Sequence, residues 1–331
     1  MAAFFSRSSR ALPYVTGAAV LGAGATYYAS RPRIQLESAQ NAPTPALSFP
    51  SSMPFPKKIT VTDVEQVNHD TKKITFSLPG GDSQVSGVPF GCKSWQAQVC
   101  LQEVLIGYTA AILTSHWPEN GWLPVFRPYT PISAPDDRGT LQLLVKQYPK
   151  GRASSHLHSL IPGSTLTVRG PIPAYTWQRS TTPRELVLIA GGAGITPIYS
   201  MARGILSDPE DQTRIQMFWG VNSTKDIVLG KELEQLEQQY PSRLRVTFCV
   251  SGAEVKPDAV ELAEPGRYKK GYVSSESLRE AITRAKAGGW GDAKGTKVFI
   301  CGPPAMEEAI AGKTGWLGGE YGVAKKEIHA F

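Results

Sequence analysis

The sequence predicts an antiparallel β-barrel followed by an α/β domain with a parallel sheet, because the pattern of apolar and polar residues changes near residue 184. Before that point, short runs of alternating apolar and polar residues are separated by turns rich in Gly, Pro and Asp, as in barrels and sandwiches. After it, near-continuous apolar runs alternate with helix-like stretches, as in a parallel sheet covered on both faces. A chain of 331 residues is long enough for both domains.

The amino-terminal segment has the features of a targeting signal and a membrane anchor. Residues 1–10 combine Arg, Ser and Phe without an acid, as mitochondrial targeting segments do. Residues 11–30 carry no charge and, as a helix, would span roughly 30 Å, one hydrocarbon core. Residues 31–56 predict a Pro-rich linker. Two interpretations stay open: a transmembrane anchor, which we favour, and a cleaved presequence.

The remaining chain divides into the two predicted domains, residues 57–176 and residues 177–331. In the first domain the alternating runs predict strands at 57–67, 72–79, 123–133, 140–148 and 164–170. In the second domain the apolar runs predict strands at 185–190, 214–220, 243–250 and 296–300. Helices are expected at 197–206, 231–239 and 275–287.

Composition and charge exclude several classes of protein. The chain has 4 Cys and no CxxC pair, which argues against zinc, thiol-redox and iron–sulfur sites. The net charge is +7, but residues 1–58 hold six basic residues and one acid, so the rest is close to neutral. Without a basic stripe we expect no nucleic-acid binding, and we expect no metal site. Any electron chemistry therefore needs an organic cofactor.

Two turns of the second domain are candidates for a nucleotide site. The strand ending at Ala190 runs into a glycine-rich turn and a helix, which lets a ligand approach the backbone at the carboxyl edge of the sheet. The strand at 296–300 runs into a Cys-Gly-Pro-Pro turn that would direct Cys301 into the same crevice. An ordinary βα turn and a buried structural cysteine are the alternatives. The candidate residues are Gly192, Gly194, Thr196 and Pro197 in the first turn and Cys301, Gly302 and Pro303 in the second.

The barrel half contributes a second set of candidates. Arg127 offers a bidentate fork to a phosphate, and strand alternation places Tyr129 on the same face. A turn of small residues at 151–155 leads into a helix and can offer backbone N–H groups to a diphosphate. A cationic strand and an ordinary helix cap are the alternatives. The candidate residues are Arg127, Pro128, Tyr129, Thr130, Lys146, Tyr148, Gly151, Arg152, Ala153 and Ser154.

Five motifs occur together in family order: RPYTPIS (127–133), VKQYPKGRASSHLHSL (145–160), VRGPIPAYTW (168–177), LIAGGAGITPIY (188–199) and FICGPPAM (299–306). Together they resemble the NADH-cytochrome b5 reductases of the fungal mitochondrial type, within the ferredoxin-reductase-like flavoprotein superfamily. The resemblance implies a FAD-binding barrel at 57–176 and a Rossmann-like NAD-binding domain at 177–331.

The resemblance also implies roles for the candidate residues. Arg127, Tyr129 and Thr130 would hold the phosphate, ribityl chain and ring edge of the flavin, and the glycine and cysteine turns would position the nicotinamide. Thr130 and Cys301 would lie at the reacting rings and are the catalytic candidates. Asp226 matches the acid that favours NADH, because a carboxylate accepts ribose hydroxyls and repels a phosphate. The alternative for Asp226 is an acid at a helix amino terminus.

The implied reaction passes hydride from NADH to FAD and then single electrons to cytochrome b5. The implied protein is a monomer anchored at the mitochondrial outer membrane through residues 11–30, or released into the intermembrane space after cleavage. A quinone, a ferric chelate or the ascorbyl radical stay open as other acceptors. A non-catalytic, membrane-anchored module stays open as a different class of function.

Residues 91–109 depart from the family pattern, which runs almost directly from a segment like SGVP (86–89) to one like AAILTS (110–115). They show neither helical nor strand periodicity and contain two of the cysteines. They are either a retained intron translated in frame or a lineage-specific surface loop. We expect such an insert to loop off the barrel, because burying it would break the strand register. If it disables FAD binding, the non-catalytic alternative gains weight.

Overall fold

The computed structural model describes residues 42–49, 51–89, 106–118, 122–252, 266–280, 296–312, 317 and 325–331, and for 106–110 the backbone alone. Residues Pro43–Phe331 form one compact unit with two six-stranded sheets. The predicted targeting segment and anchor, residues 1–30, lie outside the described residues. No helix in the described part of the chain is long and apolar enough to cross a membrane.

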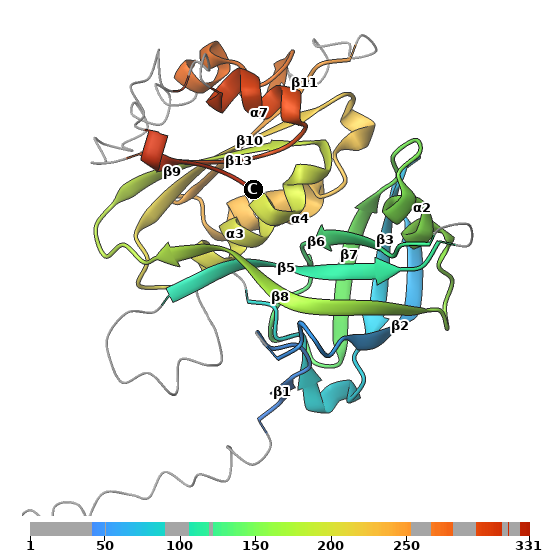
Figure 1. Ribbon diagram of the computed structural model, residues 1–331. Coiled ribbons are helices and arrows are strands. Elements are labelled where there is room, and N and C mark those ends of the chain that lie inside the picture. Colours follow the sequence, from blue (N-terminus) through green and yellow to red (C-terminus); the bar gives the residue numbers. More distant parts are fainter. Residues whose placement is uncertain are drawn as a thin grey trace, which may run out of the picture. The chain divides into compact units, whose positions relative to one another are not determined.

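The first sheet is antiparallel throughout and has the strand order β6-β5-β8-β2-β3-β7. Alternate side chains point inward and form a core that includes Ile59, Phe76, Leu141 and Val168. Helix α2 (Arg152–Ser159) packs against β6 and β7, the two edge strands, and buries Leu157 in this core (Figure 1). The curled sheet thereby gains a cover over its open side. The strands are β2 (Lys57–Gln66), β3 (Thr71–Ser77), β5 (Ile106–His116), β6 (Val125–Tyr129), β7 (Thr140–Lys146) and β8 (Thr165–Gln178).

Strand β5 corrects the expectation for residues 91–109. Residues 106–109 are not a loop: they pair with β8 from Gln178 to Tyr175 and continue directly into the rest of the strand. The sequence IGYTAAILTSH hides this strand because small residues interrupt its alternation. Residues 91–105 of the predicted insert lie outside the described residues.

The expected linker also requires a correction at its carboxyl end. Strand β1 (Thr44–Pro45) pairs in parallel with β4 (Gln84–Val85), and the Ala46 N–H donates to the Val85 carbonyl at 2.8 Å. Leu47 is only 1% exposed and belongs to the barrel core. Residues 44–47 of the expected linker are therefore docked, because an extended Pro-rich backbone still has carbonyl and N–H groups that a neighbouring strand can pair.

The second sheet is parallel, with the strand order β12-β11-β10-β9-β13-β14. Strands β9 and β10 are buried almost without interruption, because α3 (Ile195–Ser207) and α4 (Gly230–Gln239) cover one face and α7 (Pro304–Ala311) covers the other (Figure 1). The helix expected at 275–287 is helical at 275–280, and its remainder lies outside the described residues. The strands are β9 (Arg184–Gly191), β10 (Thr213–Val221), β11 (Leu244–Val250), β12 (Tyr268–Lys270), β13 (Lys297–Cys301) and β14 (Ile328–Ala330).

The two sheets are joined by strand β8, which runs across the expected boundary at residue 176. Its penultimate residue, Trp177, is buried in the core of the parallel-sheet domain and donates its Nε1–H to Asp211 Oδ2 at 2.8 Å. Arg203 on α3 donates to the carbonyl of Ile132 at 2.8 Å, which adds a second connection. These contacts join the barrel to the parallel-sheet domain.

Candidate functional site

A cavity of about 600 Å³ lies where the two sheets meet. The barrel contributes residues from the end of β7 and the segment after it, and the parallel sheet contributes the carboxyl ends of its strands, where ligands bind in such folds. Six of the predicted site residues line this cavity: Lys146, Tyr148, Gly192, Thr196, Asp226 and Pro303.

The glycine turn and the cysteine turn touch each other through their backbones. A Cβ atom built on Gly194 would lie 2.1 Å from the carbonyl oxygen of Cys301, and one on Gly302 would lie 3.2 Å from the Cα of Gly191. Gly192 differs from these glycines, because its φ is +52° and nothing lies within 4 Å of its built Cβ. The missing side chains of Gly194 and Gly302 therefore allow the two turns to touch. Gly192 instead allows the backbone to bend at a positive φ.

Cys301 is a partly buried free thiol at this contact. Burial, with a smaller contribution from Glu307, raises its pKa to about 12. The side chain is therefore a neutral thiol and not a nucleophilic thiolate. Its neighbour Gly302 donates its N–H to Glu307 Oε1 at 3.0 Å, and Pro303 caps α7.

Tyr148 connects the barrel to both turns. It is 49% exposed, and its pKa is raised mainly by burial, with Lys146 acting in the opposite direction. The backbone of Ala193 in the glycine turn and the thiol of Cys301 both lie close enough to Tyr148 to influence its pKa. The segment after β7 thus faces the glycine turn and the cysteine turn.

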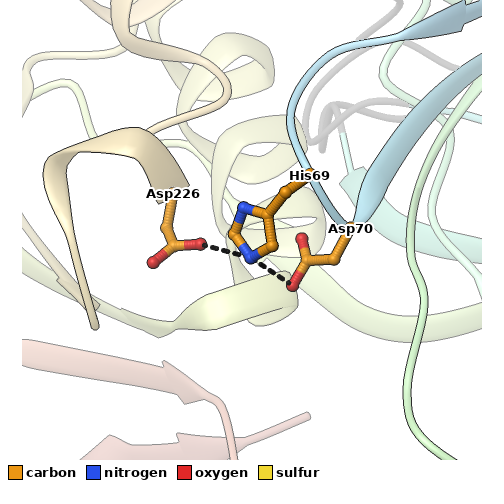
Figure 2. Close-up of side chains that lie close together, drawn as sticks. All are labelled: His69, Asp70 and Asp226. Atoms are coloured by element: carbon orange, nitrogen blue, oxygen red, sulfur yellow. Dashed lines mark ion pairs between the residues drawn. The ribbon is translucent and has the colours of Figure 1, made fainter.

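A polar cluster closes one end of the cavity. The Lys146 Nζ lies 2.9 Å from Asp70 Oδ2 and 3.7 Å from Asp226 Oδ1. His69 Nε2 lies between the same two acids, at 3.4 Å from Asp70 and 3.9 Å from Asp226 (Figure 2). Burial alone would raise the pKa of Asp70, but hydrogen bonds from Lys146 and Thr71 lower it overall. Burial alone would lower the pKa of Lys146, but the hydrogen bond and charge of Asp70, together with the charge of Asp226, raise it overall.

Asp226 has two roles in this arrangement. Its Oδ2 accepts the Ser223 N–H at 2.9 Å and the Ser223 hydroxyl at 3.0 Å, which forms a capping box on the short helix at Thr224–Asp226. Its Oδ1 faces Lys146 and His69 across the cavity. The helix-terminus interpretation therefore describes one carboxylate oxygen, and the other takes part in the ion pairs with Lys146 and His69.

The ligand atoms of His69, Asp70 and Asp226 lie within 4.8 Å of one another, a grouping that could hold a metal ion. The ammonium group of Lys146 already supplies positive charge to both acids. The cluster is thus an ion-pair network between the barrel and the parallel sheet.

The residues of β6 lie beside the cavity and do not line it. Arg127 is exposed and donates to the carbonyl of Phe126 at 2.8 Å. Burial raises the pKa of Tyr129 to about 12, with Arg127 and Tyr148 close enough to modify it. Pro128 and Thr130 complete this edge. The expectation that this strand and both turns line one cleft is therefore not met for β6, an edge strand next to α2. The barrel side of the cavity comes instead from the end of β7 and the segment after it, with Lys146 and Tyr148.

The remaining barrel candidates lie at the start of α2, and Pro197 lies in the first turn of α3. Ser154 Oγ accepts the Tyr148 N–H at 3.2 Å and donates to the Gly151 carbonyl at 3.1 Å. A Cβ on Gly151 would lie 2.4 Å from that Oγ. Ala153 is buried, and Arg152 is exposed. The first N–H groups of the helix have no intrahelical acceptor and are free to bind an anion.

The sequence interpretation missed His69 and Asp70. They occupy the turn between two correctly predicted strands, where a polar pair such as His-Asp is ordinary. Only the proximity of Lys146 and Asp226 distinguishes them.

Two family models match the chain in the expected order. An oxidoreductase FAD-binding domain matches residues 105–177, and an oxidoreductase NAD-binding domain matches residues 188–312. In the solved structures, the cytochrome b5 reductase domain of Ulva prolifera nitrate reductase is 26% identical, with a TM-score of 0.65 over 87% of this chain and 100% of that chain. The CS-b5R domains of human Ncb5or share the fold, with a TM-score of 0.58 and 21% identity over 84% of this chain and 69% of that chain.

Curated relatives extend the match along the chain. NADH-cytochrome b5 reductase 2 of Phaeosphaeria nodorum is 37% identical over 276 residues, which cover 81% of this chain and 72% of the relative. NADH-cytochrome b5 reductase 2-B of Vanderwaltozyma polyspora is 31% identical over 330 residues, 99% of this chain and 96% of the relative. Because this second match runs through nearly the whole of both sequences, the chain belongs to the NADH-cytochrome b5 reductase family.

Proposed function

We propose that the protein is a flavin-dependent reductase that passes hydride from NADH to FAD and then single electrons to cytochrome b5. One observation carries the proposal: Lys146 and Tyr148 of the FAD-type domain share a cavity with Gly192, Thr196 and Pro303 of the NAD-type domain. Hydride transfer requires two ring systems in contact, and a cavity bounded by both domains provides a place for them.

The barrel residues fit FAD. Arg127 and Arg152 are exposed cations beside the free N–H groups of α2, which together suit a diphosphate. The side chains of Tyr129 and Tyr148 flank the approach to the cavity and suit a ring system. When bound, FAD would supply the redox chemistry, in which two electrons are taken up together and released one at a time.

The parallel-sheet residues would orient the nicotinamide. Gly192 and Thr196 line the cavity and would let a ligand approach the backbone, and Cys301 would support the glycine turn as a neutral thiol beside it. Asp226 Oδ1 would accept ribose hydroxyls of NADH and repel the extra phosphate of NADPH. Thr130 would donate a hydrogen bond at the flavin edge. No side chain need act as a general base, because the cofactors carry the redox chemistry.

Anaerobic titration of the purified full-length protein with NADH tests the function. We expect a yellow protein whose flavin absorbance bleaches with one equivalent of NADH and returns on addition of oxidised cytochrome b5. Turnover with a quinone, a ferric chelate and the ascorbyl radical tests the acceptor in parallel. A colourless protein that regains no flavin on adding FAD would contradict the proposal.

We also propose that residues 11–30 anchor a monomer in the mitochondrial outer membrane. The support is their lack of charge over a bilayer-length stretch behind an Arg- and Ser-rich segment. Resistance of the protein in isolated mitochondria to alkaline carbonate extraction, lost on deletion of residues 11–30, tests the anchor. Recovery of a shortened protein in the intermembrane space would favour cleavage.

A further inference from the structure

Asp70, in the turn between β2 and β3, is fixed by hydrogen bonds on three sides. Its N–H donates to Asn68 Oδ1 at 3.1 Å, and the Thr71 hydroxyl donates to its Oδ1 at 2.8 Å. Its carbonyl accepts the Gln147 N–H at 2.7 Å, which ties the turn to the residue after β7. Asp70 is not among the described residues that line the cavity, so any effect on a ligand there acts through a neighbour.

That neighbour is Lys146, which two acids share unequally. Its Nζ lies 2.9 Å from Asp70 Oδ2 and 3.7 Å from Asp226 Oδ1. The first distance is that of a charge-assisted hydrogen bond, and the second is too long for one. Strand pairing explains the difference, because Lys146 lies opposite Thr71 and therefore next to Asp70. Asp226 approaches from the other domain (Figure 2).

The unequal sharing decides what Asp226 can do. Its Oδ2 is occupied by the capping box with Ser223. Its Oδ1 pairs with Lys146 and His69 by charge, but at 3.7 Å and 3.9 Å it accepts a hydrogen bond from neither. A ribose hydroxyl can therefore still donate to Oδ1, and a phosphate placed there would still meet its negative charge.

We propose that Asp70 is a positioning residue for the choice of dinucleotide: it holds the ammonium group of Lys146 away from Asp226, which keeps that carboxylate available to the ribose of NADH. The inference rests on the proposed function, because it concerns the same cavity. It assigns part of the preference for NADH to a residue in the barrel turn.

The reason is the position of the ammonium group once Asp70 has lost its charge. Within the described part of the chain, Asp226 is then the acid that remains within ion-pair distance of Lys146. A movement of about 1 Å would bring Nζ into a charge-assisted hydrogen bond with Oδ1. That bond would compete with the ribose hydroxyl and would neutralise the charge that repels the extra phosphate of NADPH.

Equilibrium binding of NAD+ and NADP+ to the full-length protein tests the proposal without turnover. Isothermal titration calorimetry at about pH 8, where a phosphate monoester is fully ionised, gives the ratio of the two Kd values. Asp70→Asn keeps the shape of the side chain and removes its charge. We expect it to reduce the preference for NAD+ over NADP+ by about fivefold, the upper range for a partly exposed ion pair. Asp70→Ala should give the same result, and Asp70→Glu should restore most of the preference.

The same substitution in a Lys146→Met background separates positioning from a direct effect of charge. If Asp70 acts through Lys146, Asp70→Asn should change the ratio by less than about twofold in that background. The ratio is compared within each background, so a general change of affinity caused by Lys146→Met cancels. An equal change in both backgrounds would show that Asp70 acts by its charge alone and would overturn the proposal. An unchanged ratio in Asp70→Asn and Asp70→Ala would also overturn it.

Glu65→Gln is the matched control. Glu65 is an exposed acid on β2 of the same hairpin, and its carboxylate pairs with Lys73, which does not line the cavity. The substitution changes the net charge by the same amount and should leave the ratio unchanged.

Flavin content and the bleaching of the flavin by NADH are measured on every variant. A wild-type protein without flavin, or one that NADH does not reduce, would count against the proposed function. Normal reduction with an unchanged ratio in the Asp70 variants would count against the role of Asp70 alone.

Discussion

The two domains hold their candidate residues by different physical means. In the parallel-sheet domain, the glycine and cysteine turns are fixed by backbone contact, as between Gly194 and Cys301. In the barrel, Arg127 and Tyr148 are exposed side chains on an edge strand and after a strand end. Substitutions in the first set should therefore lower the free energy of unfolding, and substitutions in the second set should weaken ligand binding.

The strongest challenge to this comparison is Gly194→Ala. The new methyl group would meet the carbonyl of Cys301, a backbone atom that cannot rotate away. We expect a loss of about 3 kcal/mol in the free energy of unfolding, measured by urea denaturation. Gly192→Ala is the matched control: it has open space but a φ of +52°, and should cost about 1 kcal/mol. Equal losses in the two variants would show that the contact between the glycine and cysteine turns does not set the free energy of unfolding.

The barrel counterpart is Arg127→Met. Losing a charge-assisted bond to a phosphate should weaken FAD binding by about 2 kcal/mol, or about thirtyfold, measured by fluorescence titration. The unfolding free energy of the flavin-free protein should stay within about 0.5 kcal/mol, because the side chain is exposed. A large loss of stability without FAD would contradict the distinction between the domains.

Trp177→Phe probes the strand that belongs to both domains. The change leaves Asp211 Oδ2 buried without its indole partner, which should cost up to about 2 kcal/mol in thermal or urea unfolding. Trp122→Phe, at an exposed position, should cost almost nothing. Two separate unfolding transitions in Trp177→Phe would indicate that this bond couples the domains.

Asp226→Ala tests the carboxylate between the domains. Removing the charge should raise the kcat/KM for NADPH relative to NADH by about tenfold, equivalent to about 1.4 kcal/mol. Ser223→Ala breaks the same capping box while keeping the acid. If Ser223→Ala changes the cofactor preference as much, the cap and not the charge sets the preference.

The smallest effect concerns a stacked pair in the barrel. The rings of His116 and His156 lie parallel, with centres 4.0 Å apart. Burial lowers the pKa of both, and His156 and Arg152 lower that of His116 further. The folded protein therefore binds these protons more weakly than the unfolded chain, so stability is full above the ordinary pKa of 6.5 and falls as the pH drops below it.

Urea unfolding of the wild type and His156→Phe at about pH 7 and about pH 5 measures this dependence. We expect the loss of stability in acid to be smaller in the variant. An equal loss in both proteins would assign the dependence to other groups, such as His329, whose pKa burial also lowers.

Local patterns in the chain predict the two classes of sheet, most strand positions and the glycine and cysteine turns, because alternation, continuous apolar runs and turn residues are properties of short segments. It missed β5, whose small residues interrupt the alternation, and the docking of Leu47, whose Pro-rich surroundings indicate only an extended backbone.

The packing of the two sheets sets which residues meet. The strand order places β9 beside β13, so Gly194 lies against Cys301, and it places β3 beside β7, so Asp70 in the β2–β3 turn reaches Lys146. His69 in the same turn reaches Asp226 of the other domain. These contacts join residues far apart in the chain, and their distances depend on how two sheets pack. Local pattern carries no information about that packing, because the same turns would form whichever strands lay beside them.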